Sequence, residues 1–290
     1  MFQSLKNLYK NEYNKKHSIF AFRRFIFWKI IRLFGLNNVK YTLWGNRKIL
    51  LDSKSFHSMW LMYNYIVDWE EFNLIKDYIK ADHTVLDVGT NMGYYTVWIS
   101  KFIGQNGQIH CFEPDSSNFK KLKQNAEINN LVKTAKLNNI ALSDTNGFIP
   151  FTLGLDGQNH INLDQSNKSV NVDTKKLDTY AEENNIEQIS YAKIDVEGFE
   201  YSVLKGAVNL LNNKKIDIIQ LEINNTVENS TNNVDDILHL LANHNYILSG
   251  YNTGEKKLFP ITYTPSRENY FAVHNLNSIN QQLSPVSETD

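Results

Sequence analysis

The stretch of residues 84–96 constrains the fold more than any other part of the chain. It begins with a β-branched and leucine-containing run that ends at Asp87, passes through Gly89 and Gly93, and leads into the apolar residues 97–99. This order predicts a strand, a tight glycine turn and the start of a helix. The glycines let the backbone approach a ligand closely, and the helix N-terminus favours a negative group. We therefore expect a ligand site at the carboxyl end of this strand.

The composition is that of a globular protein. A chain of 290 residues can bury one sizeable core. One cysteine, Cys111, excludes an intramolecular disulfide and fits a reducing compartment. No apolar run reaches the roughly 20 residues that span a membrane, and cations interrupt the aromatic N-terminus, which makes it a poor signal peptide. A cytoplasmic protein is expected.

The net charge of −1 hides an asymmetry. Residues 1–50 carry about +10 and the remaining residues about −11, which indicates two surfaces with different partners. Residues 18–34 predict a basic, aromatic-rich helix that ends at Gly35, and residues 41–52 predict a hairpin. Two interpretations of the helix stay open. In the first, residues 1–40 contact an anionic membrane or a lipid-linked glycan at the inner face of the membrane. In the second, the helix packs on the domain with its cations solvated or paired.

Strands and helices alternate after the glycine turn. The candidate strands cover residues 84–88, 108–112, 135–142, 191–194, 216–223, 246–251 and 270–273. This alternation predicts an α/β fold with a mostly parallel sheet and helices on both faces, whose ligands bind beyond the strand carboxyl ends. We expect a basic helical and hairpin extension over 1–58, an α/β domain over 59–275, and a polar tail without periodicity over 276–290.

Acidic residues follow the second and third strands. Glu113 ends the second strand, where a carboxylate can accept hydrogen bonds from both hydroxyls of a ribose. Its alternative role is to cap the helix that starts at Pro114. Ser143 and Asp144 close the third strand, in a position that suits adenine contacts, although an ordinary Ser-Asp turn explains them equally well.

The fourth strand ends in Lys-Ile-Asp-Val-Glu-Gly, residues 193–198. Asp195 and Glu197 are two residues apart in sequence with Val196 between them, at the same rim as Asp87 and Glu113. If the site binds a group donor that contains methionine, one carboxylate can face the methionine portion of this donor, and the other can face the molecule that accepts the group. The alternative is that either residue caps the following helix against its macrodipole.

Four motifs resemble those of FkbM-family methyltransferases: Asp-Val-Gly-Thr-Asn-Met-Gly (87–93), Phe-Glu-Pro (112–114), Ala-Leu-Ser-Asp (141–144) and Lys-Ile-Asp-Val-Glu-Gly-Phe-Glu (193–200). The resemblance implies a Rossmann-like, seven-stranded sheet, S-adenosylmethionine (SAM) as donor, and O-methylation of sugars, glycans or polyketide hydroxyls. By position it implies that Asp87, Gly89, Asn91 and Gly93 hold the carboxypropyl end of SAM and that Glu113 holds the ribose. The basic N-terminal segment lies outside the shared region.

Methyl transfer to a hydroxyl benefits from a general base, because the pKa of a sugar hydroxyl is high. We expect Asp195 to be this base, with Glu197 lining the reaction centre and His160 as a further candidate. Asp195, Glu222 and Asn224 offer oxygen ligands that suit Mg²⁺. Their spacing is generic, and no metal is assigned.

The acceptor is expected to be a hydroxyl of a sugar or glycan. Two alternatives stay open: a small molecule such as a polyketide, and a SAM-binding partner protein without catalysis. A nucleic-acid acceptor is disfavoured because the active-site half of the chain is acidic, whereas phosphate binding needs cations along the groove.

Overall fold

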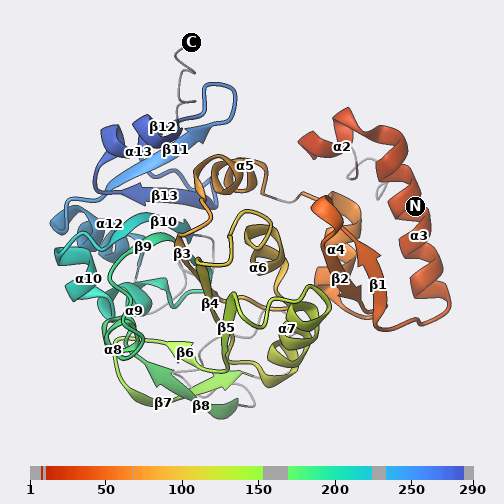
Figure 1. Cartoon of the computed structure of the whole chain (residues 1–290), viewed down its shortest axis with the longest axis horizontal. Coiled ribbons are helices and arrows are strands. Elements are labelled where there is room, and N and C mark those ends of the chain that lie inside the picture. Colours follow the sequence, from red (N-terminus) through yellow and green to blue (C-terminus); the bar gives the residue numbers. More distant parts are fainter. Residues whose placement is uncertain (1–7, 9–10, 67, 153–168, 224–232, 284–290) are drawn as a thin grey trace.

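The computed structural model describes residue 8 and residues 11–66, 68–152, 169–223 and 233–283. Its largest element is an eight-stranded mixed sheet (Figure 1). In spatial order its strands are β12 (Lys257–Pro260), β11 (Ile247–Asn252), β13 (Asn269–Val273), β10 (Ile216–Glu222), β9 (Ile189–Ile194), β3 (Thr84–Val88), β4 (Gln108–Phe112) and β5 (Ala135–Asn138). Strands β5, β4, β3, β9 and β10 are parallel. Strands β13, β11 and β12 join by antiparallel pairing. The sheet is therefore mostly parallel, as expected.

The expected count of seven strands is wrong within the described residues, because β12 adds an eighth. The side chain of Asn252 accepts hydrogen bonds from the backbone N–H groups of Gly254 at 2.9 Å and Glu255 at 3.1 Å. Such an Asx turn reverses the chain, and β12 then pairs antiparallel with β11.

The expected strand over residues 135–142 is divided between two sheets. β5 ends at Asn138, and β6 (Ala141–Leu142) belongs to a three-stranded sheet with β7 (Gly147–Thr152) and β8 (Ser169–Lys175). The break lies at Asn139, whose amide donates to the backbone carbonyls of Glu113 at 2.8 Å and Pro114 at 3.1 Å. This contact turns the chain over the end of β4 and out of the large sheet.

Helices cover both faces of the large sheet (Figure 1). One face carries α5 (Trp69–Tyr78), α6 (Tyr94–Ile99) and α7 (Ser116–Ile128); the other carries α8 (Leu177–Glu183), α9 (Glu200–Lys205), α10 (Val208–Asn212) and α12 (Val234–Asn243). Side chains alternate between the two cores, as the pleat requires. Val85 of β3 packs in the first core, whereas Leu86 and Val88 pack in the second.

The N-terminal residues pack beside α6 and α7. They form the helices α2 (Glu12–Lys16), α3 (Ser18–Leu33) and α4 (Phe56–Asn64). Between α3 and α4 lies a hairpin of β1 (Val39–Thr42) and β2 (Lys48–Leu51), joined by a 3₁₀ turn (Trp44–Asn46). The expected helix and hairpin are both present. Two asparagines of α7 fasten the hairpin: the Asn125 side chain accepts from Leu50 N at 2.8 Å, and that of Asn129 accepts from Lys48 N at 2.8 Å. Of the helices in the described ranges, none is both long and apolar enough to traverse a bilayer.

Arg24 is buried inside this N-terminal part, unlike the other cations of α3. Its side chain is 2% exposed and donates to the side chain of Asn14 at 2.5 Å and to the carbonyl of Met62 at 3.2 Å. Burial lowers the pKa of its guanidinium, and the rings of Phe20 and Tyr65 lie within 5 Å of it. Arg24 therefore joins α2, α3 and α4 and is not part of the exposed basic surface.

The tail expected over residues 276–290 is wrong in its first half, since α13 (Leu276–Leu283) is a helix. Leu276, Ile279 and Leu283 recur at helical spacing, and the latter two are buried. Asn280 exchanges two hydrogen bonds with the backbone of Leu258 on β12, at 2.8 and 2.9 Å. The added strand and this helix thus stabilise each other.

Candidate active site

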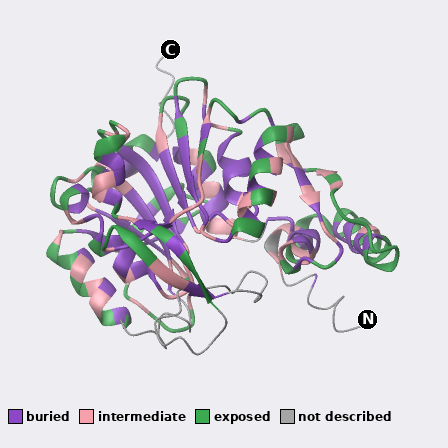
Figure 2. Ribbon diagram, turned by 90° about the horizontal axis from the view of Figure 1, so that it is seen from below, coloured by how far each residue is buried: buried purple, intermediate pink, exposed green. Residues whose placement is uncertain are grey.

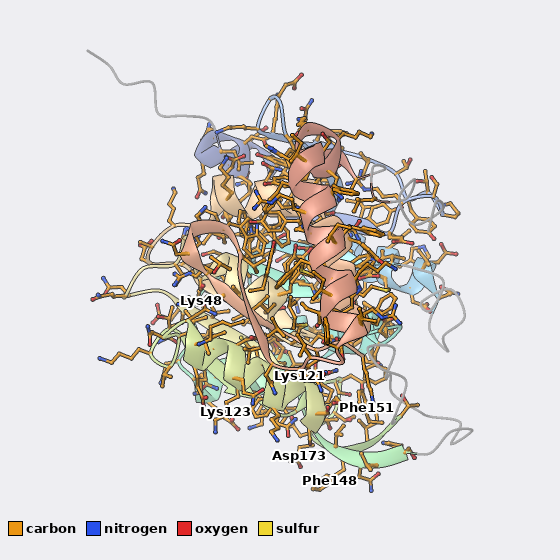
Figure 3. All side chains as sticks on the ribbon, turned by 90° about the vertical axis from the view of Figure 1, so that its right-hand side faces the viewer. Lys48, Lys121, Lys123, Phe148, Phe151 and Asp173 are labelled. Carbon is orange, nitrogen blue, oxygen red and sulfur yellow. The ribbon has the colours of Figure 1, made fainter. Side chains whose placement is uncertain are left out.

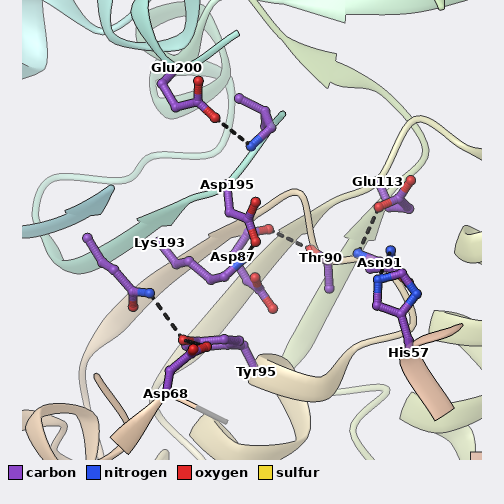
Figure 4. A network of polar contacts seen from close by, with 12 residues as sticks. His57, Asp68, Asp87, Thr90, Asn91, Tyr95, Glu113, Lys193, Asp195 and Glu200 are labelled. Atoms are coloured by element: carbon purple, nitrogen blue, oxygen red, sulfur yellow. Dashed lines mark hydrogen bonds and ion pairs between the residues drawn. The ribbon is translucent and has the colours of Figure 1, made fainter. Parts of the chain in front are cut away.

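A cavity of about 470 Å³ opens at the carboxyl ends of β3, β4, β9 and β10. Its volume is in the range of small-molecule sites. The Gly89 turn, Glu113 and residues 140–142 line one half, Lys193, Asp195 and Glu222 line the other, and side chains of α4 also line the cavity. Figure 4 shows the polar residues of both halves gathered around the ends of β3 and β9.

Gly89 lets β3 and β9 come together at the floor of the cavity. Its φ is +75°, and a Cβ there would lie 1.7 Å from the carbonyl oxygen of Asp195. The turn is held by Thr90, whose hydroxyl donates to the carbonyl of Asp87 at 2.6 Å. Asn91 follows with a φ of 53°, and its backbone N–H points away from the turn to Glu113.

Asp87 and Gly93 support this turn from behind the cavity lining. Asp87 is fully buried and accepts a hydrogen bond from the hydroxyl of Thr96 at 2.6 Å, while its other oxygen has no partner among the described residues. Burial raises the pKa of this carboxyl, opposed by Lys193. Of the four expected carboxypropyl contacts, the structure places Gly89 and Asn91 on the cavity wall and Asp87 and Gly93 beneath it.

Glu113 lies where the sequence places it, at the end of β4 and on the cavity wall. One carboxyl oxygen accepts from the backbone N–H of Asn91 at 2.7 Å, and the other accepts from that of Asp115 at 2.9 Å. Burial raises the pKa of Glu113 to about 7, opposed by these two hydrogen bonds. Each carboxylate oxygen keeps further lone pairs for a ligand, so the group can accept from two neighbouring hydroxyls.

Ser143 and Asp144 lie outside the cavity lining. The side chain of Asp144 pairs with Lys205 at 2.8 Å, which lowers the pKa of Asp144 although partial burial opposes the shift. Ser143 donates its backbone N–H to Lys175 on β8. The apolar residues Ile140, Ala141 and Leu142 line the cavity instead, because the chain leaves the large sheet just before them.

Lys193, Asp195 and Glu222 form a coupled charge cluster in the other half of the cavity. Lys193 donates to Asp195 at 2.8 Å. Burial raises the pKa of Asp195, but the lysine outweighs it and the net shift is downward. The negative charge of Asp195 raises the pKa of the hydrogen-bonded Glu222 well above its usual range. The two carboxyl groups therefore titrate as a pair, in which the ammonium of Lys193 favours the ionised form of Asp195 and the charge of Asp195 favours the protonated form of Glu222.

A third carboxyl group in the same half belongs to Asp68, which no sequence motif singled out. It accepts a hydrogen bond from the hydroxyl of Tyr95 at 2.5 Å, and that hydroxyl accepts from Gln220 at 3.1 Å. Burial raises the pKa of Asp68 to about 6. The ammonium of Lys193 lies 4.9 Å from the centre of the Tyr95 ring, which links this chain to the charge cluster. The sequence signal that could have indicated this part of the cavity is the acidic and aromatic composition of residues 59–72.

The N-terminal part of the chain closes the cavity beside the donor turn. His57 Nε2 lies 3.1 Å from Nδ2 of Asn91, and the half-exposed rings of Phe56 and Trp60 line the opening. Glu197 also lines the cavity, with a φ of 52°. His160 and Asn224 lie outside the described residues. Within the described residues, no three His, Cys, Asp or Glu side chains are arranged to hold a metal ion.

The residues present fit SAM. Glu113 matches the two ribose hydroxyls, and the apolar wall of residues 140–142 matches a purine ring. The turn at Gly89 and Asn91 lines the cavity between these two parts, close to the end of β9. This combination of sheet order, glycine turn and nucleoside wall defines a class I SAM-dependent methyltransferase.

The family follows from the sequence. The model described as the methyltransferase FkbM domain matches residues 87–248. The chain belongs to the FkbM methyltransferase family and is a SAM-dependent methyltransferase.

Two curated proteins are similar to parts of this chain. The hexuronic acid methyltransferase AglP of Haloferax volcanii is 24% identical over 168 residues, which cover 58% of this chain and 68% of that protein. Methyltransferase 1 of Beauveria bassiana is 28% identical over 146 residues, 43% of this chain and 58% of that protein. Among solved structures, the methyltransferase FkbM from Methylobacillus flagellatus aligns with a TM-score of 0.45 at 14% identity, over 67% of this chain and 44% of that one.

Proposed function

We propose that this methyltransferase transfers the methyl group of SAM to a hydroxyl of a neutral sugar or glycan. The observation that carries the proposal is the chemistry of the acceptor half of the cavity. Asp68, Asp195, Glu222 and Glu268 line it, and Lys193 is the one Lys or Arg among the described lining residues. The ionised carboxylates among them accept hydrogen bonds from hydroxyl donors, and the aromatic rings at the opening offer flat apolar surfaces for sugar faces.

The negative charge of the acceptor half favours an acceptor that differs from that of the Haloferax volcanii relative. A hexuronic acid carries a carboxylate of its own, and like charges within a poorly solvated cavity repel strongly. Lys193 is already paired with Asp195 at 2.8 Å. A neutral polyhydroxy acceptor avoids this repulsion, and for that reason we favour it over a uronic acid.

Asp195 is the proposed general base. When bound, SAM supplies an activated methyl group on a sulfonium, so the chain mainly aligns the acceptor oxygen and removes its proton. Lys193 keeps the Asp195 carboxylate ionised and fixes it with a hydrogen bond. The ion pair with Lys193 at 2.8 Å favours Asp195 as the ionised member of the pair with Glu222, so Asp195 is the member proposed to take the acceptor proton. Glu197 is proposed to help position the acceptor.

Asp68 is the competing candidate for this role, because a pKa of about 6 suits a base at neutral pH better than a lowered one. The two assignments differ in their pH dependence. Catalysis by Asp68 would fall as the pH drops below about 6, where that carboxyl takes up a proton. Catalysis by Asp195 would persist there, since its pKa is lowered.

The test measures label transfer from methyl-labelled SAM to neutral glycans and their lipid-linked precursors. Asp195→Asn should reduce kcat about 10²- to 10⁴-fold, the usual contribution of a general base, with SAM affinity by calorimetry unchanged. Asp173→Asn, an exposed site on β8, is the matched control. Full activity of Asp195→Asn would refute the base assignment, and a pH profile of Asp68→Asn identifies the alternative.

Two other functions are separated by the same assay. Label in a small molecule such as a polyketide, and none in glycans, would favour a small-molecule O-methyltransferase. Tight SAM binding without transfer to any extract would favour a non-catalytic partner protein. We further propose a cytoplasmic location, where a lipid-linked acceptor would be met at the inner membrane surface through residues 1–40.

A further inference from the structure

Helix α3 has two apolar faces, and one of them has no partner among the described residues. The inner face packs against α4 and the hairpin through Ala21, Phe25, Trp28 and Ile31. The outer face, here called the outer stripe, consists of five exposed apolar side chains: Ile19 (77%), Phe22 (47%), Ile26 (42%), Ile30 (45%) and Leu33 (79%).

The outer stripe is continuous along the whole helix. Its members are three or four residues apart, so at 100° per residue they fall within an arc of about 80°. Phe34 and Leu36, both exposed, extend it beyond the last turn. In the view of Figure 3, α3 lies across the outer side of the molecule, and Figure 2 shows exposed residues recurring along the N-terminal helices at its edge. An apolar surface of this length on a helix marks an interaction site.

Cations border the outer stripe on both sides. On the helical wheel, Arg23 lies about 20° beyond Ile30, and Lys29 lies about 20° beyond Phe22 on the opposite edge. Both are exposed, as is Arg32. Helix α3 contains no Asp or Glu, and among the described residues no acidic side chain forms an ion pair with these three cations. The surface therefore complements a partner that is apolar and negatively charged at once.

We propose that α3 lies in the plane of a bilayer surface that contains anionic phospholipid. The outer stripe would enter the boundary between headgroups and acyl chains, with Arg23 and Lys29 at the level of the phosphates. The helix stays parallel to the surface because its opposite face is packed on α4. Pairing of two copies through this stripe would bring cations against cations without any acid in either helix, which favours the membrane over a second copy.

The inference does not rest on the acceptor proposed above, and its test needs no catalysis. Full-length protein is floated with vesicles of equimolar phosphatidylcholine and phosphatidylglycerol, and with vesicles of phosphatidylcholine alone. The wild type should bind the anionic vesicles at least tenfold more tightly than the neutral ones. The triple variant Phe22→Ser/Ile26→Ser/Ile30→Ser should lose that binding, and Arg23→Gln/Lys29→Gln should weaken it and reduce its dependence on salt.

The matched control replaces three exposed apolar residues elsewhere, Val132→Ser/Phe148→Ser/Ile247→Ser, and should bind as the wild type does. Circular dichroism and SAM calorimetry on each variant show that the fold and donor site are intact. The proposal is overturned if the wild type ignores anionic vesicles, or if the outer-stripe variant binds them unchanged. It is equally overturned if light scattering shows that the wild type is a dimer, that the outer-stripe variant is a monomer, and that the wild type does not bind vesicles.

Discussion

Glu113 illustrates how one carboxyl can serve both the fold and the ligand. It holds the backbone of Asn91 and of Asp115 at once, and so connects the glycine turn to the start of α7. Its burial raises the pKa to about 7, which makes its charge sensitive to pH in the physiological range. We propose that donor binding depends on the same protonation state of Glu113 as the geometry of the turn.

Replacement of Glu113 should weaken SAM binding. Glu113→Ala is expected to raise the Kd about 10- to 100-fold, because a hydrogen bond to a charged group contributes about 1.5–3 kcal/mol. In the wild type the affinity should rise as the pH rises through about 7, where the carboxyl ionises and accepts better from hydroxyls. Calorimetry at several pH values checks both points. Glu113→Gln should remove the pH dependence, and an unchanged profile would show that this group does not contact the donor.

Glu200 is a buried carboxyl whose effect should appear in stability. One of its oxygens accepts from the N–H groups of Val196 and Gly198, the other has no partner among the described residues, and burial raises its pKa to about 7. The folded state then binds more protons than the unfolded state between pH of about 4.5 and 7. Stability should therefore fall as the pH rises through this window, by about 3 kcal/mol at most.

Melting curves of the wild type and Glu200→Gln across this pH range test the prediction. The variant should show a smaller decline, since one of several buried carboxyls no longer titrates. Glu182→Gln, at an exposed position on α8, should leave the decline as it is. Identical declines in all three proteins would mean that Glu200 is ionised in the folded state as readily as in the unfolded one.

At the scale of elements, α7 connects the N-terminal hairpin to the donor turn. The fully buried Asn125 accepts from Leu50 N on β2 and donates to the carbonyl of Met92 in the turn, both at 2.8 Å. Asn125→Ala should cost about 2–4 kcal/mol of unfolding free energy, because a buried donor and a buried acceptor lose their partner. Urea denaturation measures this loss. Asn213→Ala, at an exposed site, should cost little; an equal loss in both would contradict the connection.

The elements that sequence patterns could predict are those with strong local signals. The β-branched run before Gly89 and the alternation after it define the parallel part of the sheet. The eighth strand and α13 were missed because each is short and stabilised by the other, through Asn280 and Leu258. The helical spacing of Leu276, Ile279 and Leu283 is a local signal confined to one helix of 8 residues, and the pairing of that helix with β12 has no local pattern.

The cavity residues at the strand ends could be expected from the sequence, and those from the segments before the first parallel strand could not. Gly89 and Glu113 follow strands that pair in the sheet, so their proximity follows from topology. Asp68 and His57 reach the cavity from segments before the first parallel strand, where no periodicity specifies a position. Ser143 and Asp144 lie outside the cavity lining because β6 leaves the large sheet, and their expected contact with adenine stays a prediction.

At the scale of the whole molecule, one apolar core joins the N-terminal part to the α/β domain. Trp28 and Ile31 of α3 belong to the same buried cluster as Phe72 of α5 and Tyr191 of β9. A shared core predicts that these parts unfold together.

Calorimetry should therefore show one unfolding transition with matching calorimetric and van't Hoff enthalpies. Trp28→Ala should shift that whole transition, at a cost of about 3–5 kcal/mol for a buried tryptophan. Phe148→Ala, an exposed aromatic on β7, should shift it little. Two transitions, of which Trp28→Ala moves only one, would mean that the extension folds on its own.

The walls of the cavity have consequences for how the enzyme could be redesigned. The region that the family shares, residues 87–248, contains the Gly89 turn, Glu113 and residues 140–142, which line the proposed donor half of the cavity. Phe56, His57, Trp60 and Asp68 come before it, and Glu268 and Asn269 come after it. We therefore expect that exchanging these flanking segments between relatives would change which acceptor is methylated, while Lys193, Asp195 and Glu222 stay with the shared region.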